Sequence, residues 1–250
     1  MNDISVLWVP WVTGFLVLMT HVPLGEQVLQ RGIVFIDLAI AQVAALGVLM
    51  AGTLIDDHHW SWPAGSLAAL GGAALVAWLS ERWPERREAL IGLVYIAAAA
   101  VAVLWVSADP HGHQKLSAML AGDVLWVNWQ DLLPLSIASV TVLLLQSFRP
   151  QLLSRTWAFY PCFAILVSLS VPLLGLYLVF ASLIVPALSV AHRNGSSSRW
   201  LAVGLGSAGY ALGLLASLWL DLPSGPSIVL TLMLTGLLTA TGSPALAKQR

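Results

Sequence analysis

The sequence predicts an all-α protein, a polytopic bundle of eight to nine transmembrane helices in one domain over residues 1–250. Three observations predict it. Hydrophobic residues make up 58% of the 250 residues and charged residues 9%, whereas an average soluble domain carries about 25% charged residues. Nine apolar segments follow one another along the chain, and basic residues collect on alternate connections between them. The apolar residues therefore face lipid, where helices satisfy their own backbone polar groups.

The nine segments are joined by short connections. The N-terminal residues lack the basic stretch of a signal peptide, so we expect a retained first helix. A lipid-spanning helix needs about 20 mostly apolar residues, and several segments are short for one crossing. Segments six and seven are separated by an uncharged break around Pro172 and Gly175, which predicts a tight hairpin or one bent unit. The segments cover residues 4–22, 32–54, 63–80, 89–107, 132–148, 157–173, 175–191, 200–220 and 225–242.

The distribution of Lys and Arg predicts the orientation in the membrane. With nine spans, ten of these residues fall on one side and only Lys115 on the other. Basic residues are retained on the cytoplasmic side, so the N-terminus is expected outside and the C-terminus in the cytoplasm of a multi-pass protein of the inner (plasma) membrane. The ten are Arg31, Arg82, Arg86, Arg87, Arg149, Arg155, Arg193, Arg199, Lys248 and Arg250.

Several functional classes are excluded by composition and by motif. With 11 basic and 12 acidic residues, the chain has no charge excess for nucleic acid, and membrane lipid is the expected surroundings. Cys162 is the only cysteine, so neither a disulfide nor a thiolate metal site is expected. The sequence contains no P-loop, no G-x-S-x-G and no H-E-x-x-H. We therefore expect a protein that is not an enzyme and binds no covalent cofactor.

The second segment contains a carboxylate and an amide, Asp37 and Gln42, in an otherwise apolar run. An ionisable side chain inside a membrane helix costs roughly 2.5 to 3.5 kcal/mol and is by default functional. This predicts an inward-facing polar site on a transport path. The alternative is that Asp37, six residues after Arg31, lies among the lipid headgroups and pairs with a neighbour or stays wet.

Potential metal ligands collect on the connections predicted to lie outside. Imidazole and carboxylate together suit zinc, manganese or iron(II), so these residues are candidates for capturing an ion at the mouth of a path. The alternative is a plain solvated loop. The candidates are Asp56, Asp57, His58 and His59 after the second segment, and His111 and His113, with Asp109, after the fourth.

Four stretches, in this order and spacing, resemble the membrane permease of zinc, manganese and iron ABC importers, the ABC-3 family. The likeness covers the chain from about Pro23 to the C-terminus. The stretches are Pro23-Leu24-Gly25 with the helix from Arg31 to Gly47, similar to the family's proline-leucine-glycine turn and polar helix; Gly122-Asp123-Val124-Leu125 with Asp131; residues 175–187 (GLYLVFASLIVPA); and residues 221–226 (DLPSGP).

The resemblance implies a homodimeric permease that moves a divalent metal ion, zinc or manganese, as its substrate. Two cytoplasmic ATP-binding subunits and an external metal-binding protein are its implied partners, and Asp37, Gln42 and Asp123 are the expected path residues. The family's polar helix carries an aspartate and, four residues later, a histidine. Here Leu38 and Gln42 occupy those positions. Asp37 and Gln42 are five residues apart, about 140° around a helix, so they are not expected to share one ion.

A second departure concerns the cytoplasmic partner. Family members insert a helix before the sixth segment to dock the ATPase, whereas residues 149–155 (RPQLLSR) leave room for little more than a turn. Either docking moves elsewhere, to residues 81–88 (ERWPERRE), or the ATPase is engaged differently. The alternatives are an uncoupled or proton-linked metal carrier and a non-transporting membrane scaffold. The docking candidates are Arg82, Arg86, Arg87, Arg149 and Arg155.

Overall fold

The structure, a computed structural model, describes residues 6–54, 61–107, 109, 112–122, 124–149, 151–191 and 196–241, without the side chains of residues 61, 113, 196, 240 and 241. Within these ranges the chain forms helices and turns and no strand. The helices are α1 (Trp8–Arg31), α2 (Ile36–Leu54), α3 (Ser61–Arg82), η3 (Pro84–Arg86), α4 (Arg87–Val106), α5 (Gly112–Ala121), η4 (Val124–Trp126), α6 (Leu132–Phe148), α7 (Thr156–Leu174), α8 (Leu176–Ser189), α9 (Ser196–Leu220) and α10 (Ser224–Thr241).

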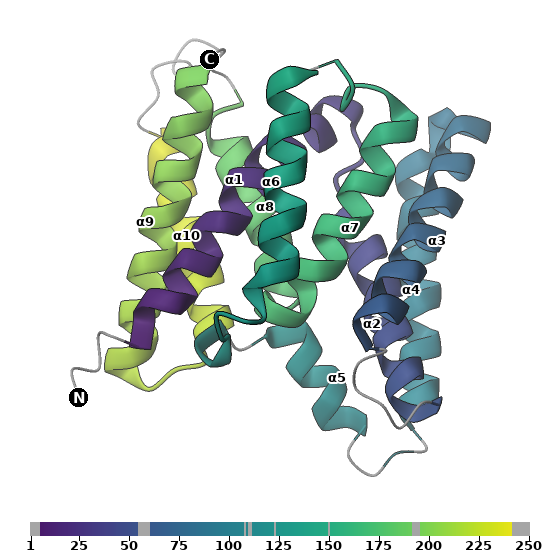
Figure 1. The fold of residues 1–250 in the computed structure, drawn as a ribbon, viewed down its shortest axis with the longest axis horizontal. Coiled ribbons are helices and arrows are strands. Elements are labelled where there is room, and N and C mark those ends of the chain that lie inside the picture. Colours follow the sequence, from purple (N-terminus) through teal and green to yellow (C-terminus); the bar gives the residue numbers. More distant parts are fainter. Residues whose placement is uncertain are drawn as a thin grey trace.

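Nine of the described helices run alternately between the two ends of the bundle, and the short helix α5 lies at the end where α1 begins (Figure 1). Six of them are long and apolar enough to cross a membrane, and α6, α8 and α10 are shorter apolar helices. The predicted all-α transmembrane bundle is confirmed. The connections with Arg31, Arg82, Arg86, Arg149 and Arg155 share one end, which we call the basic end, and Lys115 lies at the other.

Helix α1 differs from the sequence prediction, because it continues from the first segment through to Arg31. The expected turn at Pro23-Leu24-Gly25 is wrong, since these residues are helical. The reason is packing: a side chain at Gly25 would collide with the backbone carbonyl of Leu183 on α8. The helix ends only at Gly32, whose left-handed φ of 60° lets its N–H bond to Leu29 O, as glycine commonly does after a helix.

Helix α8 lies at the centre of the bundle and contacts α1, α9 and α10. Its 14 residues span about 21 Å at 1.5 Å per residue, short of the roughly 30 Å hydrocarbon core of a bilayer. Ten of them are buried, so protein surrounds most of the helix. Ser182 on α8 bonds to the Tyr210 hydroxyl of α9 at 2.7 Å, which satisfies both polar groups inside the apolar core.

Three glycines from three of the motifs meet at the α5 end of the bundle. Gly175 is the single residue between α7 and α8, with φ 79° and ψ 159°, and it makes the tight hairpin predicted for segments six and seven. A side chain there would collide with the backbone of Gly122, which itself has a φ of 66°. A side chain at Gly225 would collide with Ala121 O. Backbone-to-backbone contact therefore holds α5 against the α7–α8 hairpin and the start of α10.

We predict that Gly175→Ala lowers the melting temperature of the purified protein by about 5 °C or more, because alanine is strained at this φ and its methyl group meets backbone. The control is Gly92→Ala in α4, where the added methyl group meets no atom within 4 Å. Alanine should leave stability unchanged or raise it there. Equal melting temperatures for Gly175→Ala and the unaltered protein would contradict the contact.

Candidate functional site

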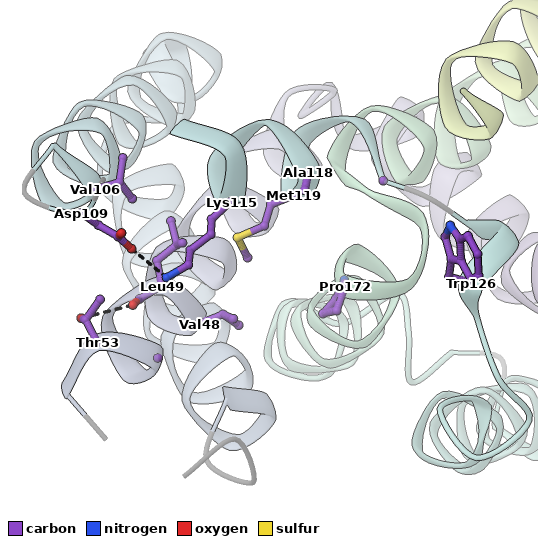
Figure 2. Close-up of a pocket in the computed structure, with 12 residues that line it drawn as sticks. Val48, Leu49, Thr53, Val106, Asp109, Lys115, Ala118, Met119, Trp126 and Pro172 are labelled. Atoms are coloured by element: carbon purple, nitrogen blue, oxygen red, sulfur yellow. Dashed lines mark hydrogen bonds and ion pairs between the residues drawn. The ribbon is translucent and has the colours of Figure 1, made fainter. Parts of the chain in front are cut away.

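A cavity of about 710 Å³ opens at the α5 end of the bundle, between α2, α4, α5 and α7 (Figure 2). We call it the α5 cavity. The last two turns of α2 form one wall, and Trp126 and Pro172 lie on the opposite side. Most of the lining is apolar. The lining residues are Val48, Leu49, Gly52, Thr53, Val106, Asp109, Lys115, Ala118, Met119, Gly122, Trp126 and Pro172.

The polar groups of the α5 cavity are few and engaged in contacts. Lys115 Nζ lies 2.7 Å from Asp109 Oδ2, which joins α5 to the end of α4 (Figure 2). Thr53 Oγ1 donates to Met50 O at 2.9 Å and accepts from Trp105 Nε1 at 2.8 Å. Among the described residues no three His, Cys, Asp or Glu side chains gather to hold a metal ion.

Asp37 lies in the first turn of α2, near the basic end, and its side chain is fully buried. Among the described residues, neither carboxylate oxygen has a hydrogen-bond partner. The alternative of a wet or paired headgroup carboxylate does not describe this side chain. A buried carboxylate without partners is costly, and the positive end of the α2 dipole offsets only part of that cost.

Gln42 is also buried, with 2% of its surface exposed. Because α2 is a regular helix from Ile36 to Leu54, Gln42 and Asp37 stay about 140° apart around its axis. The two side chains therefore face different neighbours. The family's aspartate position is held by Leu38, which packs against the apolar core.

A buried histidine, His21, was not among the path or metal residues predicted from the sequence. Its Nδ1 lies 3.1 Å from Val17 O, and its buried Nε2 has no hydrogen-bond partner in the part of the chain that the structure describes. In the sequence His21 stands at the end of the first apolar segment and looks like a boundary residue. Only the continuation of α1 to Arg31 places it inside the bundle.

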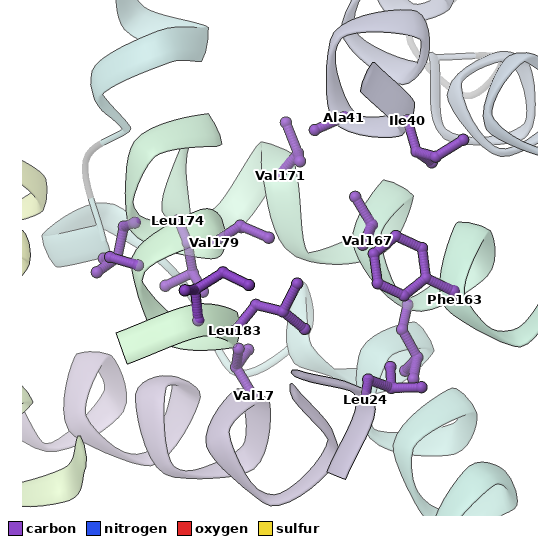
Figure 3. Close-up of a cluster of buried hydrophobic side chains, with 14 of the residues drawn as sticks. Val17, Leu24, Ile40, Ala41, Phe163, Val167, Val171, Leu174, Val179 and Leu183 are labelled. Carbon is purple, nitrogen blue, oxygen red and sulfur yellow. The ribbon is translucent and has the colours of Figure 1, made fainter. Parts of the chain in front are cut away.

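An apolar cluster separates the α5 cavity from Asp37. Ile40 and Ala41 of α2 face Val167 and Val171 of α7, with α8 behind them (Figure 3). All four are at most 2% exposed. From Asp37 to Val48, the first cavity residue, α2 rises about 16 Å. A hydrated ion cannot cross a dry apolar contact of this kind without large desolvation cost, so the structure is closed between cavity and carboxylate.

The predicted metal ligands lie outside the described residues, as does the predicted path residue Asp123; the ligands are Asp56, Asp57, His58, His59 and His111, together with the side chain of His113. Three residues of the α5 cavity nevertheless adjoin them in sequence. Thr53 precedes the first group by three residues, Asp109 precedes His111 by two, and Gly122 precedes Asp123 directly. Their role in metal capture stays a prediction.

The predicted docking residues lie at the basic end. Arg82, Arg86, Arg149 and Arg155 are exposed, and Arg87 is half-buried. The guanidinium of Arg82 lies over the Trp83 ring at 5.7 Å from its centre. These residues come from the α3–α4 and α6–α7 connections, so the end opposite the α5 cavity carries exposed arginines, together with the exposed Glu81 and Glu85.

Comparison with known proteins identifies the family. The sequence pattern of the ABC 3 transport family matches residues 3–159 and 146–242. The chain belongs to the ABC 3 transport family. The resemblance drawn from the four motifs is thereby confirmed, and this ABC 3 permease is a multi-pass integral membrane protein.

Relatives of the ABC 3 permease cover nearly its whole length. The high-affinity zinc uptake system membrane protein ZnuB of Buchnera aphidicola is 23% identical over 241 residues, which are 88% of this chain and 91% of the relative. A probable metal transport system membrane protein of Chlamydia trachomatis is 26% identical over 235 residues, 83% of this chain and 78% of the relative. PsaBC from Streptococcus pneumoniae, solved with a Fab, has the same fold, with a TM-score of 0.76 at 20% identity over 99% of this chain and 95% of that chain.

Accessibility to water should separate the α5 cavity from the apolar cluster. In a Cys162→Ala background, we predict that Met119→Cys reacts with a membrane-impermeant maleimide added outside intact cells. Ala41→Cys should react at least tenfold more slowly, because a thiol must be hydrated to ionise and react. Similar labelling of both positions would contradict the closed contact, and labelling of Met119→Cys only in inverted vesicles would reverse the predicted orientation.

Proposed function

We propose that this ABC 3 permease is the membrane subunit of a divalent metal-ion importer, with zinc or manganese as its substrate and ATP hydrolysis on a separate subunit as its energy source. The buried, unpartnered carboxylate of Asp37 is the observation that carries the proposal. It lies on the same helix as the wall of the α5 cavity. The names of the relatives, a zinc uptake protein and a metal transport protein, support a metal ion as the substrate.

The route follows α2. An ion released by an external metal-binding protein enters the α5 cavity, whose lining residues Thr53, Asp109 and Gly122 are close in sequence to Asp56 to His59, His111, His113 and Asp123. It then passes the apolar cluster of Ile40, Ala41, Val167 and Val171 to reach Asp37 and Gln42. Because the cluster is closed in this structure, passage requires α2 to move relative to α7 and α8. Opening the cavity side and the basic side in turn would give alternating access.

The energy for that movement comes from a partner, since the chain contains no P-loop. The basic end fits an ATP-binding subunit, whose acidic groups would pair with the exposed Arg82, Arg86, Arg149 and Arg155. A second copy of the chain completes the path as a homodimer. The selected metal depends on geometry more than on ligand type, so zinc and manganese are both tested below.

One observation favours a second candidate, an uncoupled or proton-linked metal carrier. The α6–α7 connection is only a turn between Phe148 and Thr156, which is short for a docking helix. Co-purification decides between the two candidates. Stable recovery of the ATPase encoded beside this chain, in a fixed ratio, would rule out the uncoupled carrier.

Metal uptake tests the proposal as a whole. Cells that lack their own high-affinity importer should regain growth under chelation when they express this chain with its neighbouring ATPase and external binding protein. Zinc and manganese are supplied separately, and the metal that restores growth is the substrate. If neither metal restores growth, metal import is not the function.

Asp37 is the first residue to alter. We predict that Asp37→Asn lowers metal uptake at least tenfold while the protein still folds, because the amide keeps the size but removes the charge that attracts a cation. Asp221→Asn, at an exposed turn of positive φ, is the matched control and should transport normally. Normal uptake by Asp37→Asn would remove Asp37 from the path. A scaffold subunit would also tolerate Asp37→Leu, with assembly intact.

A further inference from the structure

Arg31, the last residue of α1, reaches from its helix to the α6–α7 connection. Its Nη2 donates to two backbone carbonyls, Leu153 O at 3.1 Å and Ser154 O at 2.8 Å. Its guanidinium also lies 4.2 Å from the centre of the Phe159 ring, which is fully buried in α7. Because both acceptors belong to the backbone, Arg31 holds the shape of the turn whatever side chains the turn carries.

The turn itself has an anchored side and an exposed side. Leu152 N donates to Arg149 O at 2.9 Å and Arg155 N to Leu152 O at 3.0 Å, so the segment is wound tightly. Leu153 is buried, while Ser154 and Arg155 are exposed. A partner docked on the exposed side therefore pushes on a segment whose other side is bonded to Arg31.

The other end of this link is the start of α2. Only residues 32–35 separate Arg31 from α2, and they are fixed at both ends. Ile33 N donates to Val28 O and Ile36 N to Ile33 O, and both isoleucine side chains are buried. Val34 N donates to Glu88 Oε1 at 2.5 Å, in the first turn of α4. A displacement of Arg31 is thus passed to the first turn of α2, where Asp37 lies.

We propose that Arg31 is a positioning residue that connects an ATP-binding subunit docked on residues 151–155 to the first turn of α2. The three connections at residues 32–35, 84–88 and 151–155 then form one docking surface, joined through Arg31 and Glu88. This explains how a turn too short to be a docking helix can still transmit movement to the path. The inference rests on the proposed function.

A purely structural role for Arg31 would give a different result. A cation at the C-terminal end of a helix stabilises that helix, and a lysine keeps this effect. Lysine, however, is a point charge that cannot donate to two carbonyls and lie flat on Phe159 at once. If Arg31 only stabilises its helix, Arg31→Lys should therefore transport metal normally. If Arg31 couples the docked subunit to α2, Arg31→Lys should keep only part of the transport.

The test uses the permease with its neighbouring ATPase in proteoliposomes, with the external binding protein loaded with Zn²⁺ or Mn²⁺. The number of metal ions transported per ATP hydrolysed is measured for Arg31→Met and Arg31→Lys. We expect Arg31→Met to co-purify with the ATPase and hydrolyse ATP within about twofold of the unaltered complex, but to transport at least tenfold less metal per ATP. Arg31→Lys should lose about threefold to fivefold.

The control is Arg199→Met. Arg199 also lies at the basic end and pairs with Glu26 of α1 at 2.7 Å, but among the described residues its hydrogen bond and ion pair go to Glu26 and not to residues 151–155. It should keep the unaltered ratio.

Two other outcomes overturn different claims. If both Arg31 variants keep the unaltered ratio, or if Arg31→Met fails to fold and Arg31→Lys is fully active, Arg31 is not a coupling residue. If the unaltered chain neither binds the ATPase nor transports metal, the proposed function fails and the inference with it.

Discussion

The burial of one carboxylate is the constraint on which the rest of the structure depends. Asp37 is withdrawn from water without a partner among the described residues, and such a group persists only where the surrounding helices are held firmly. α2 therefore packs against α3, α4 and α7, and its start is tied to α4 through Glu88. The same helix begins to form the wall of the α5 cavity at Val48, twelve residues after its first turn begins and about 18 Å along the axis.

The two ends of the bundle are held by different chemistry. At the α5 end, the backbone of Gly122 contacts the backbone of Gly175. The end of α5 therefore packs against the α7–α8 hairpin with no side chain between these two residues. At the basic end, hydrogen bonds from Arg31 and to Glu88 join the connections. Close glycine contacts resist sliding of one helix on another. The hydrogen bonds at the basic end instead link three separate connections to one another, at the end where we propose that a partner docks.

Much of the fold and part of the site could be predicted from residues alone. The bounds of α6 agree with the predicted segment, because polar residues lie just outside both ends of its apolar run. His21 and the extent of α1 were missed, since Pro23 and Gly25 resemble a turn until α8 packs against them. The role of Arg31 was also missed, because its two acceptors are backbone carbonyls more than 120 residues away, which leave no side-chain signal.

The sequence by itself determined the membrane class, the alternating helices, the basic end and the family, because each depends on composition or on short motifs read along the chain. Tertiary structure alone decided that Asp37 is buried, that Ala41 and Val171 belong to the apolar cluster beside it, and that Gly122 meets Gly175. These are contacts between helices distant in sequence. Hydropathy records that a residue prefers to be buried, but only packing decides which neighbour it meets.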